Sequence, residues 1–197
     1  MELGLQEALL RRSKRIEHLR EEILKLPSSA GGITFEIGCG KGHYLSAYGQ
    51  AHPQEICVGI DLISSRIRDG ERKNEKRGNR NVFFLKASCE EFLEAMPESV
   101  KIAKVFVFFP DPWPKKRHHR RRLMQPEFLE NLKSHCKNGA ILYFRTDHGE
   151  YFQWTLELLK SRSDWLLQAD NTLPFEEVSQ FQRILPVFST LKAVLKG

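Results

Sequence analysis

The sequence lacks any long hydrophobic run. No stretch approaches the roughly eighteen consecutive apolar residues that a membrane-spanning helix requires. The N-terminal segment also lacks the basic-then-apolar order of a secretory signal peptide. We therefore expect a cytoplasmic protein that makes no contact with a membrane.

Cysteine is also scarce. The four cysteines, Cys39, Cys57, Cys89 and Cys136, form no C-x-x-C pair, and no histidine lies at ligand spacing from them. Their spacing matches neither a zinc site nor a disulfide scaffold. We expect free thiols and no metal site.

Low-complexity tracts, internal repeats and an excess of proline or glycine are absent as well. Of the 197 residues, 41% are hydrophobic and 28% are charged, which is typical of a folded globular chain and excludes disordered and collagen-like classes. This length suits one compact domain. We expect a single domain over residues 1–197, with a helical extension at 1–27.

The sequence does contain a local excess of positive charge. The net charge is +6, and the segment KKRHHRRR at Lys115–Arg122 holds six Lys or Arg residues and no acid. The rest of the chain is therefore neutral. Charge concentrated in this way suits a polyanion such as nucleic acid, and a solvated loop is the alternative interpretation.

Apolar residues recur at three-, four- and seven-residue steps between residues 3 and 26, with Arg, Lys and Glu between them. This period predicts an amphipathic helix that ends at Pro27. For its basic residues, a solvated face is favoured over contact with a phosphate backbone.

Short apolar runs alternate with helical patterns over most of the remaining chain. Strands are predicted at 33–38, 55–61, 81–88, 104–111 and 139–147, and helices at 43–52, 64–78, 89–96, 126–136 and 150–161. This alternation predicts the doubly wound α/β class, with a mostly parallel sheet covered on both faces. After Trp165 the pattern is ambiguous, and residues 185–197 predict one or two strands at the edge of the sheet.

The first predicted strand runs into a glycine-rich turn. Glu36 lies at the strand tip, and Gly38, Gly40 and Gly42 follow at alternate positions. Such a turn between a strand and a helix brings bare backbone close to a ligand. A dinucleotide fingerprint, G-x-G-x-x-G, would need its third glycine where His43 stands, so the spacing points away from NAD.

An acid also ends the second predicted strand. Asp61 follows Gly38 by 23 residues, at the position where a carboxylate can hold the two ribose hydroxyls of a nucleoside. Together, Glu36, the glycine turn and Asp61 resemble the S-adenosylmethionine (SAM) pocket of Rossmann-like methyltransferases.

The fourth predicted strand ends in FFPDPWPKKRHHRRR, residues 108–122. Asp111 lies between prolines that stiffen the chain, so it is held out into the crevice where the reactive end of a cofactor should lie. For Trp113, stacking on a base and packing under the loop both remain open.

At this point the sequence resembles a specific family. The stretch PDPWPKKRHHRRRL, preceded by EIGCGKG and GIDL and followed by FRTD, is similar to the bacterial tRNA (guanine-N7-)-methyltransferases over roughly residues 33–160. The resemblance implies the Rossmann-like class I methyltransferase fold. It also implies transfer of a methyl group from SAM to N7 of the variable-loop guanosine at tRNA position 46.

The resemblance further implies roles for individual residues. The SAM pocket would be lined by Glu36, Gly38, Gly40, Asp61, Ser88 and Asp111, of which Asp111 is also the implied catalytic residue. Contact with the substrate guanosine would fall to Lys115, Asp147 and Glu176. Contact with RNA would fall to Arg117, His118, His119, Arg120, Arg121 and Arg122. No metal and no obligatory protein partner is implied.

Three features depart from the family's pattern, one of which is a shorter segment between Asp147 and the late substrate motif. Ser88 stands where the family has an Asp that reads the adenine amino group, and a hydroxyl accepts that hydrogen bond more weakly than a carboxylate. The late T-x-Y-E motif is reduced to Leu-Pro-Phe-Glu at 173–176, which leaves Glu176 as the clear match.

Guanine N7 carries a lone pair and no hydrogen, so its methylation needs placement rather than a general base. We expect Asp111 or Asp147 to stabilise the developing positive charge or to accept the guanine N1 and N2 hydrogens. His118 and His119 then serve as neutral polar partners in the loop. Two alternatives stay open: a SAM-dependent methyltransferase acting on another RNA or a small molecule, and an RNA-binding module with a vestigial SAM pocket.

Overall fold

A computed structural model describes residues 2–177 and 187–197 of the chain. The strands are β1 Ile33–Ile37, β2 Cys57–Asp61, β3 Val82–Lys86, β4 Ile102–Phe108, β5 Cys136–Thr146, β6 Trp165–Leu167 and β7 Ser189–Leu195. The helices are α1 Glu2–Leu24, α2 His43–Ala51, α3 Ser64–Arg77, α4 Cys89–Ala95, the 3-10 helix η1 Lys116–Arg121, α5 Pro126–His135 and α6 Gly149–Lys160.

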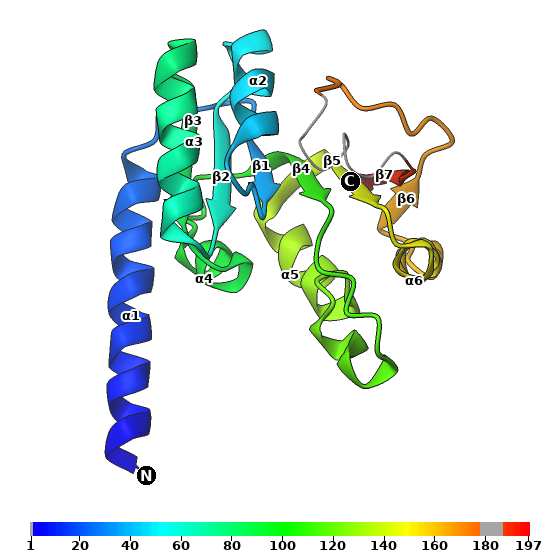
Figure 1. Cartoon of the computed structure of the whole chain (residues 1–197), viewed down its shortest axis with the longest axis horizontal. Coiled ribbons are helices and arrows are strands. Elements are labelled where there is room, and N and C mark those ends of the chain that lie inside the picture. Colours follow the sequence, from blue (N-terminus) through cyan, green and yellow to red (C-terminus); the bar gives the residue numbers. More distant parts are fainter. Residues whose placement is uncertain (1, 178–186) are drawn as a thin grey trace.

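In the described part of the chain, seven strands form one sheet in the order β3-β2-β1-β4-β5-β7-β6 (Figure 1). Strands β1 to β5 are parallel, whereas β7 runs antiparallel to both β5 and β6. The predicted doubly wound, mostly parallel α/β fold is confirmed. Each of the five predicted strands overlaps an observed one, and β4 ends earlier than predicted, at Phe108.

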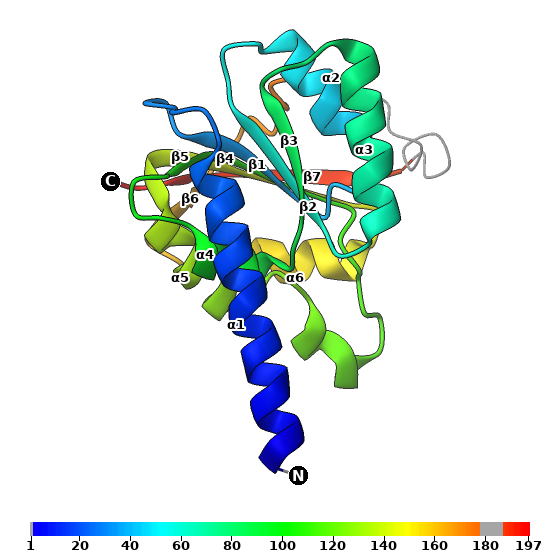
Figure 2. The same ribbon diagram turned by 90° about the vertical axis from the view of Figure 1, so that its left-hand side faces the viewer.

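Helices cover both faces of the sheet, which Figure 2 shows close to edge-on. On one face, Tyr44 of α2 and Ile67 of α3 share a core with Phe106 of β4. On the other face, Phe92 of α4 and Leu129 of α5 belong to a larger core that also takes in side chains of α1 and α6. The central strands are buried from both sides, which explains their continuous apolar runs.

Helix α1 confirms the predicted amphipathic helix. Its C-terminal half buries Leu19 and Ile23 in the same core as Phe92 of α4. Nearer the N-terminus, Arg15 Nη2 lies 2.7 Å from Glu91 Oε1 of α4. Exposed ion pairs of this kind contribute little stability, so the buried apolar residues hold the helix to the body. The N-terminal half projects beyond the sheet (Figures 1 and 2).

Two local predictions need correction. Residues 185–197 were expected to supply one or two edge strands; residues 185 and 186 lie outside the described residues, and β7 lies between β5 and β6 rather than at the edge. The edge position belongs to the three-residue β6, which is too short to show a period. The basic segment, expected as a loop, forms the short helix η1.

The four thiols are free, as expected. Burial raises the pKa of Cys57, Cys89 and Cys136 to about 12 in each case, so these groups stay protonated and unreactive near neutral pH. Among the described residues, none of the helices combines the length and apolarity needed to cross a membrane.

The glycine turn packs tightly against Phe84 and Gly70 at Gly42. The φ of Gly42 is 64°, and a Cβ there would lie 2.5 Å from Phe84 Cζ and 2.9 Å from Gly70 Cα. Gly78 has a φ of 71°, but a Cβ there would meet no heavy atom within 4 Å. We expect Gly78→Ala to lower the free energy of unfolding by about 1 kcal/mol, from backbone strain alone.

Gly42→Ala should cost about 2 kcal/mol more than Gly78→Ala, because overpacking adds to the same strain. Urea unfolding of the two variants measures both values. Equal losses would show that the close approach at Gly42 is not a constraint on the fold.

Candidate functional site

The site lies at the carboxyl edge of the sheet, where the strand order reverses between β1 and β4. Ligands bind at this switch point in open α/β sheets, because the connections leave it in opposite directions. Two adjoining cavities open there, of about 500 and 390 Å³. The residues that line both are Gly38, Arg66, Phe108, Phe109 and Asp111.

The glycine turn presents bare backbone to these cavities. Gly38 has a φ of 72° and Gly40 a φ of 54°, conformations that side chains rarely adopt. A Cβ at either position would meet no heavy atom within 4 Å. The space beside this backbone is therefore open to a ligand, unlike that beside Gly42.

Asp61, at the tip of β2, holds the turn in place. Its carboxylate accepts hydrogen bonds from the backbone N–H of Gly40 at 3.1 Å and of Ile63 at 2.8 Å. Arg66 Nη1 lies 3.4 Å from the same carboxylate. A carboxylate offers about four acceptor sites, so Asp61 retains capacity for hydroxyl donors from the cavity.

Glu36, at the tip of β1, is buried with its carboxyl group incompletely paired. Within residues 2–177 and 187–197, its Oε2 has no hydrogen-bond partner. Burial raises the pKa of Glu36 to about 8 and outweighs a backbone hydrogen bond from Leu45 that lowers it. Because Glu36 also lines the smaller cavity, a donor or cation placed there would satisfy it.

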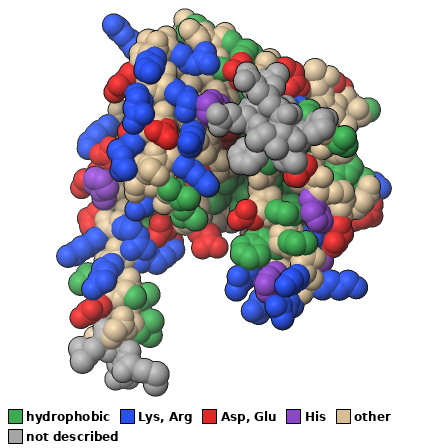
Figure 3. Space-filling view, in the orientation of Figure 1, with side chains coloured by type: hydrophobic (Ala, Val, Ile, Leu, Met, Phe, Trp, Pro, Cys, Tyr) green, Lys and Arg blue, Asp and Glu red, His purple; other side chains and the backbone are tan. Residues whose placement is uncertain are grey.

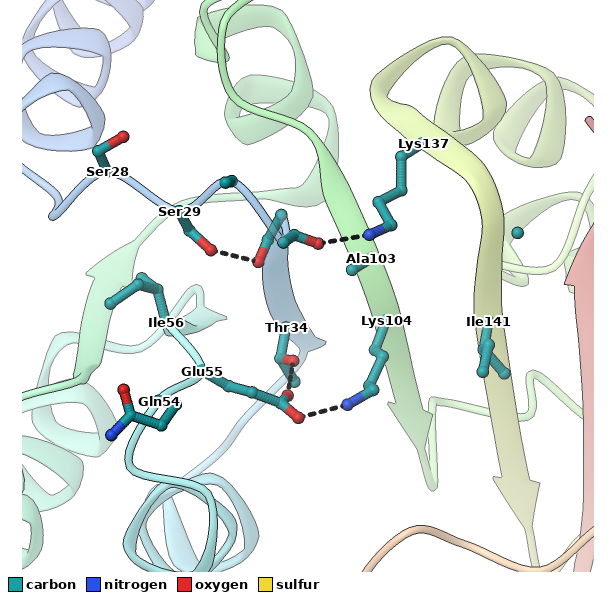
Figure 4. Close-up of a pocket in the computed structure, with 14 residues that line it drawn as sticks. Ser28, Ser29, Thr34, Gln54, Glu55, Ile56, Ala103, Lys104, Lys137 and Ile141 are labelled. Atoms are coloured by element: carbon teal, nitrogen blue, oxygen red, sulfur yellow. Dashed lines mark hydrogen bonds and ion pairs between the residues drawn. The ribbon is translucent and has the colours of Figure 1, made fainter.

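Glu55 provides a contrast at the opposite edge of the sheet, in a cavity of about 510 Å³ (Figure 4). Lys104 Nζ lies 2.5 Å from Glu55 Oε1, and Thr34 Oγ1 donates to Oε2 at 2.7 Å. Burial alone would raise the pKa of Glu55. The hydrogen bonds from Lys104, Thr34 and Tyr48 together outweigh burial, so the pKa is lowered. This cavity satisfies its own acid, whereas the carboxyl-edge site does not.

Ser88 lines the larger cavity and also begins α4. Its Oγ accepts a hydrogen bond from the backbone N–H of Glu91 at 3.1 Å, which is a helix cap. One lone pair of the hydroxyl is thereby used, and recognition of an adenine amino group by Ser88 stays a prediction.

The segment after β4 carries backbone strain. Phe109 has a φ of 48° and Trp113 a φ of 44°, both uncommon for residues with side chains. Each such residue costs on the order of 1–3 kcal/mol, and such strain is concentrated at functional sites. Between them, Asp111 is exposed and lines both cavities, as the sequence predicted for an acid held into the crevice.

The basic segment lies beside these cavities. The exposed side chains are Lys115, Lys116, Arg117, Arg120 and Arg121. Figure 3 shows Lys and Arg side chains gathered at η1. Arg121 also lines the larger cavity and lies over the Trp113 ring, 4.9 Å from its centroid. Trp113 is half-buried. The cation that covers its ring, Arg121, also faces the cavity.

The predicted RNA contact at Arg122 is wrong. Its guanidinium is fully buried, 5.0 Å from the Tyr151 ring centroid and 5.3 Å from that of Trp154. Its Nε donates to the Pro112 carbonyl at 2.8 Å. Arg122 therefore fastens the strained segment to α6.

His119 belongs to the same buried network. Arg122 Nη2 lies 3.0 Å from His119 Nε2, which is 3.3 Å from Glu150 Oε1. The His119 ring also packs edge-on against Trp154. These contacts agree with the expected role of a polar partner, and the neighbouring half-buried His118 contacts the Trp113 ring.

The residues predicted to contact guanosine lie on three different segments. Asp147 is exposed immediately after β5, and Lys115 is exposed immediately before η1. Glu176 forms a bidentate ion pair with Arg145 Nη1 and Nη2, at 3.2 and 2.9 Å. None of the three lines the two cavities described above, so their contact with substrate stays a prediction.

Arg145 is a residue of the site that was not predicted from the sequence. This residue is buried on β5, lines the smaller cavity and lies 5.7 Å from the centroid of the Phe108 ring. Its neighbours in the sequence, Phe144 and Thr146, are also buried, so an arginine between them was the available signal.

The lining fits a cationic nucleoside such as SAM. Asp61 offers acceptors to hydroxyls, and Glu36 offers an unsatisfied carboxyl group to a cation. Leu62 and Ile63 are 67% and 44% exposed on the wall of the larger cavity, where an aromatic base would cover them. Among the described residues, no group of three or more His, Cys, Asp or Glu side chains is arranged to hold a metal.

A mostly parallel sheet with an antiparallel seventh strand, and a cavity at its carboxyl switch point, define a Rossmann-like methyltransferase fold. Residues 31–184 match the family model Methyltransf_4, described as "Putative methyltransferase". The chain belongs to this family.

Curated relatives bear out the resemblance seen in the sequence. The chain is 33% identical over 134 residues to the tRNA (guanine-N(7)-)-methyltransferase of Caulobacter vibrioides, covering 68% of this chain and 59% of that protein. It is 39% identical over 130 residues to the enzyme of that name from Mycoplasma pneumoniae, covering 64% and 60%. The chain thus spans about three fifths of the length of these relatives.

Solved structures agree on the fold. A 16S rRNA (adenine(1408)-N(1))-methyltransferase variant from Catenulisporales acidiphilia, solved with SAM, superposes with a TM-score of 0.61 at 20% identity, covering 90% of this chain and 92% of that one. The precorrin-6y C5,15-methyltransferase of Geobacter metallireducens gives a TM-score of 0.58 at 11% identity, covering 92% and 87%.

The raised pKa of Glu36 predicts a pH-dependent stability difference. An unfolded glutamate ionises near 4.5, whereas folded Glu36 stays protonated up to about pH 8. Between these pH values Glu36 is protonated in the folded state and ionised in the unfolded state. The contribution of Glu36 to the free energy of unfolding is therefore full below pH 4.5 and is lost as the pH rises toward 8. Glu36→Gln remains neutral throughout.

The stability of the wild type minus that of Glu36→Gln should therefore fall by about 1.4 kcal/mol per pH unit between pH 5.5 and 7.5. Urea unfolding at three pH values measures this slope, with the exposed Glu98→Gln as control. A difference that does not vary with pH would contradict a neutral, buried Glu36.

Proposed function

We propose that this protein transfers a methyl group from SAM to N7 of the variable-loop guanosine, position 46, of tRNA. The observation that carries the proposal is the placement of Asp111. This acid lines both cavities at the switch point and lies in the strained segment that leads directly into the exposed cations of η1. A nucleoside cofactor and a polyanionic substrate would meet at that point.

The names of the curated relatives support the choice of substrate. The family match over residues 31–184 includes the whole PDPW segment and the basic run. The exposed side chains of η1 supply what a phosphate backbone requires, which is clustered positive charge without acids. Arg121 beside Trp113 adds planar surfaces on which an unpaired base can stack.

Different residues of this chain would bind the ribose, the adenine and the ammonium group of SAM. Asp61 would accept the ribose hydroxyls, and Leu62 and Ile63 would cover the adenine. Glu36 would ionise to pair with the ammonium group. When bound, SAM supplies an electrophilic methyl group on a sulfonium sulfur.

The chain's own residues then have to place the guanine and stabilise charge. Because N7 has a free lone pair, no base is needed to remove a proton from it, and orientation alone can lower such a barrier by about 7–11 kcal/mol. Methylation makes the purine ring cationic. Asp111, exposed at the cavity wall, would stabilise that charge or accept the N1 and N2 hydrogens.

The test of the proposal is transfer of labelled methyl from SAM to unmodified tRNA and to the same tRNA with its position-46 guanosine changed to adenosine. We expect 7-methylguanosine from the first RNA and no label in the second. Equal label in both would support a methyltransferase with another target. If the protein neither labelled tRNA nor bound SAM, the RNA-binding module would be favoured.

Asp111→Asn should reduce the rate of methyl transfer by about 10²-fold or more, because it removes a charge positioned for the cationic product. The affinity for SAM should change only slightly, since the amide keeps the shape of the side chain. Single-turnover kinetics and SAM titration measure the two effects, with the exposed Asp170→Asn as the matched control.

Full activity in Asp111→Asn would exclude this role for the carboxylate. A parallel loss of SAM affinity would instead assign Asp111 to cofactor binding alone.

A further inference from the structure

Helix α3 carries a second cluster of positive charge on the face of the molecule shown in Figure 3, apart from η1. We define the α3 basic stripe as Lys41, from the glycine turn, with Arg66, Arg72, Lys73, Lys76 and Arg77. Of this set, Arg66 and Lys41 line the cavities of the candidate site.

The charges of α3 are segregated by side. Lys73 Nζ donates to the carbonyl of Lys41 at 2.8 Å, and Arg77 Nη1 donates to Gln50 Oε1 at 2.7 Å, so both reach toward α2. Glu71 and Glu75 instead line a groove on the side facing α1. The helix thus keeps most of its acids away from the stripe.

Two acids pair with cations of the stripe: Asp69, and Glu177, whose Oε1 lies 3.9 Å from Arg77 Nη2. Asp69 has the closer contacts. It is 3.4 Å from Arg72 and 3.8 Å from Lys41, so one carboxylate is shared by two exposed cations. Burial lowers the pKa of His43, and the charges of Lys73 and Lys41 each lower it by more than the charge of Glu177 raises it, so the field at this side chain is positive.

The position of the stripe links it to the site. It starts at Arg66, which lines both cavities and lies 3.4 Å from Asp61. From Arg66 to Arg77 the helix rises about 16 Å, which is more than one phosphate can cover. Because Arg121 of the η1 segment lines the larger cavity as well, basic residues border the site from two elements.

We propose that the α3 basic stripe binds the sugar-phosphate backbone of the RNA whose guanosine enters the cavity, so that η1 and α3 hold one RNA at two places. This inference rests on the proposed function for the identity of the substrate. Phosphate contacts of this kind carry no sequence information but orient the substrate.

The chemistry of α3 favours RNA over a lipid surface. A helix that lies on a membrane needs large apolar side chains beside its cations. The one large apolar residue of α3, Ile67, is buried in the core. Leu62 and Ile63, exposed just before α3, line the larger cavity with Arg66. Beyond Arg66, the exposed arginine and lysine side chains of the helix suit phosphates in an extended chain.

The test compares two double variants with equal loss of charge. Arg72→Gln with Lys76→Gln removes two cations from the stripe and leaves the cavity lining intact. Lys137→Gln with Lys160→Gln removes two exposed cations elsewhere, on β5 and α6, and serves as control. Glutamine keeps helix propensity close to that of the residues replaced.

Binding of unmodified tRNA is measured over a range of salt concentrations. We expect the stripe variant to bind about tenfold more weakly near 0.15 M salt and to lose about 1.5 from the slope of log K against log salt, as two phosphate contacts predict. The rate of methyl transfer at saturating tRNA and the affinity for SAM should stay at wild-type values. The single variant Arg72→Lys, which keeps the charge, should retain most of the wild-type slope.

A slope in the stripe variant equal to those of the wild type and the control would overturn the inference. So would binding of the stripe to phosphatidylglycerol vesicles that tRNA does not compete away. If the wild type transferred no methyl group to tRNA while its tRNA binding still depended on the stripe, the proposed reaction would fail and the RNA surface would stand.

Discussion

The parallel pairing of β1 with both β2 and β4 is the constraint on which the site depends. Phe35 pairs with Val58 on one side and with Val105 on the other, so the tips of three strands end at one edge. Side chains alternate along a strand, and a shift of one residue would move Glu36 into the opposite core. Burial of Phe35 against the ring of Phe92 opposes such a shift. The core thereby sets the register of the site.

Much of the fold was predictable because burial from both sides leaves continuous apolar runs in strands such as β1 and β2, separated by helical periods. The late strands were not. β6 has three residues, and the position of β7 depends on its pairing with β5, which a local pattern cannot express. The helical form of η1 was missed because its cations hide any period.

At the site, the residues that could be predicted from the sequence are those whose contacts lie nearby in the chain. Glycines with positive φ and Asp61 at a strand tip are recognisable because the turn itself requires them. Arg122 and Arg145 are not, because their partners come from distant segments: Tyr151 for the first and Glu176 for the second. In a run of three arginines, composition cannot tell the buried one from its exposed neighbours.

The burial of Arg122 also bears on how the exposed cations work. Its bond to the Pro112 carbonyl and its contacts with Tyr151 and Trp154 link the Pro112 end of the strained segment to α6. Under the proposed function, a segment held in this way would lose less conformational entropy on binding RNA than a free basic loop. The bonded carbonyl of Pro112 directly precedes Trp113, whose φ is 44°. One buried arginine therefore makes its exposed neighbours a positioned surface rather than a diffuse charge.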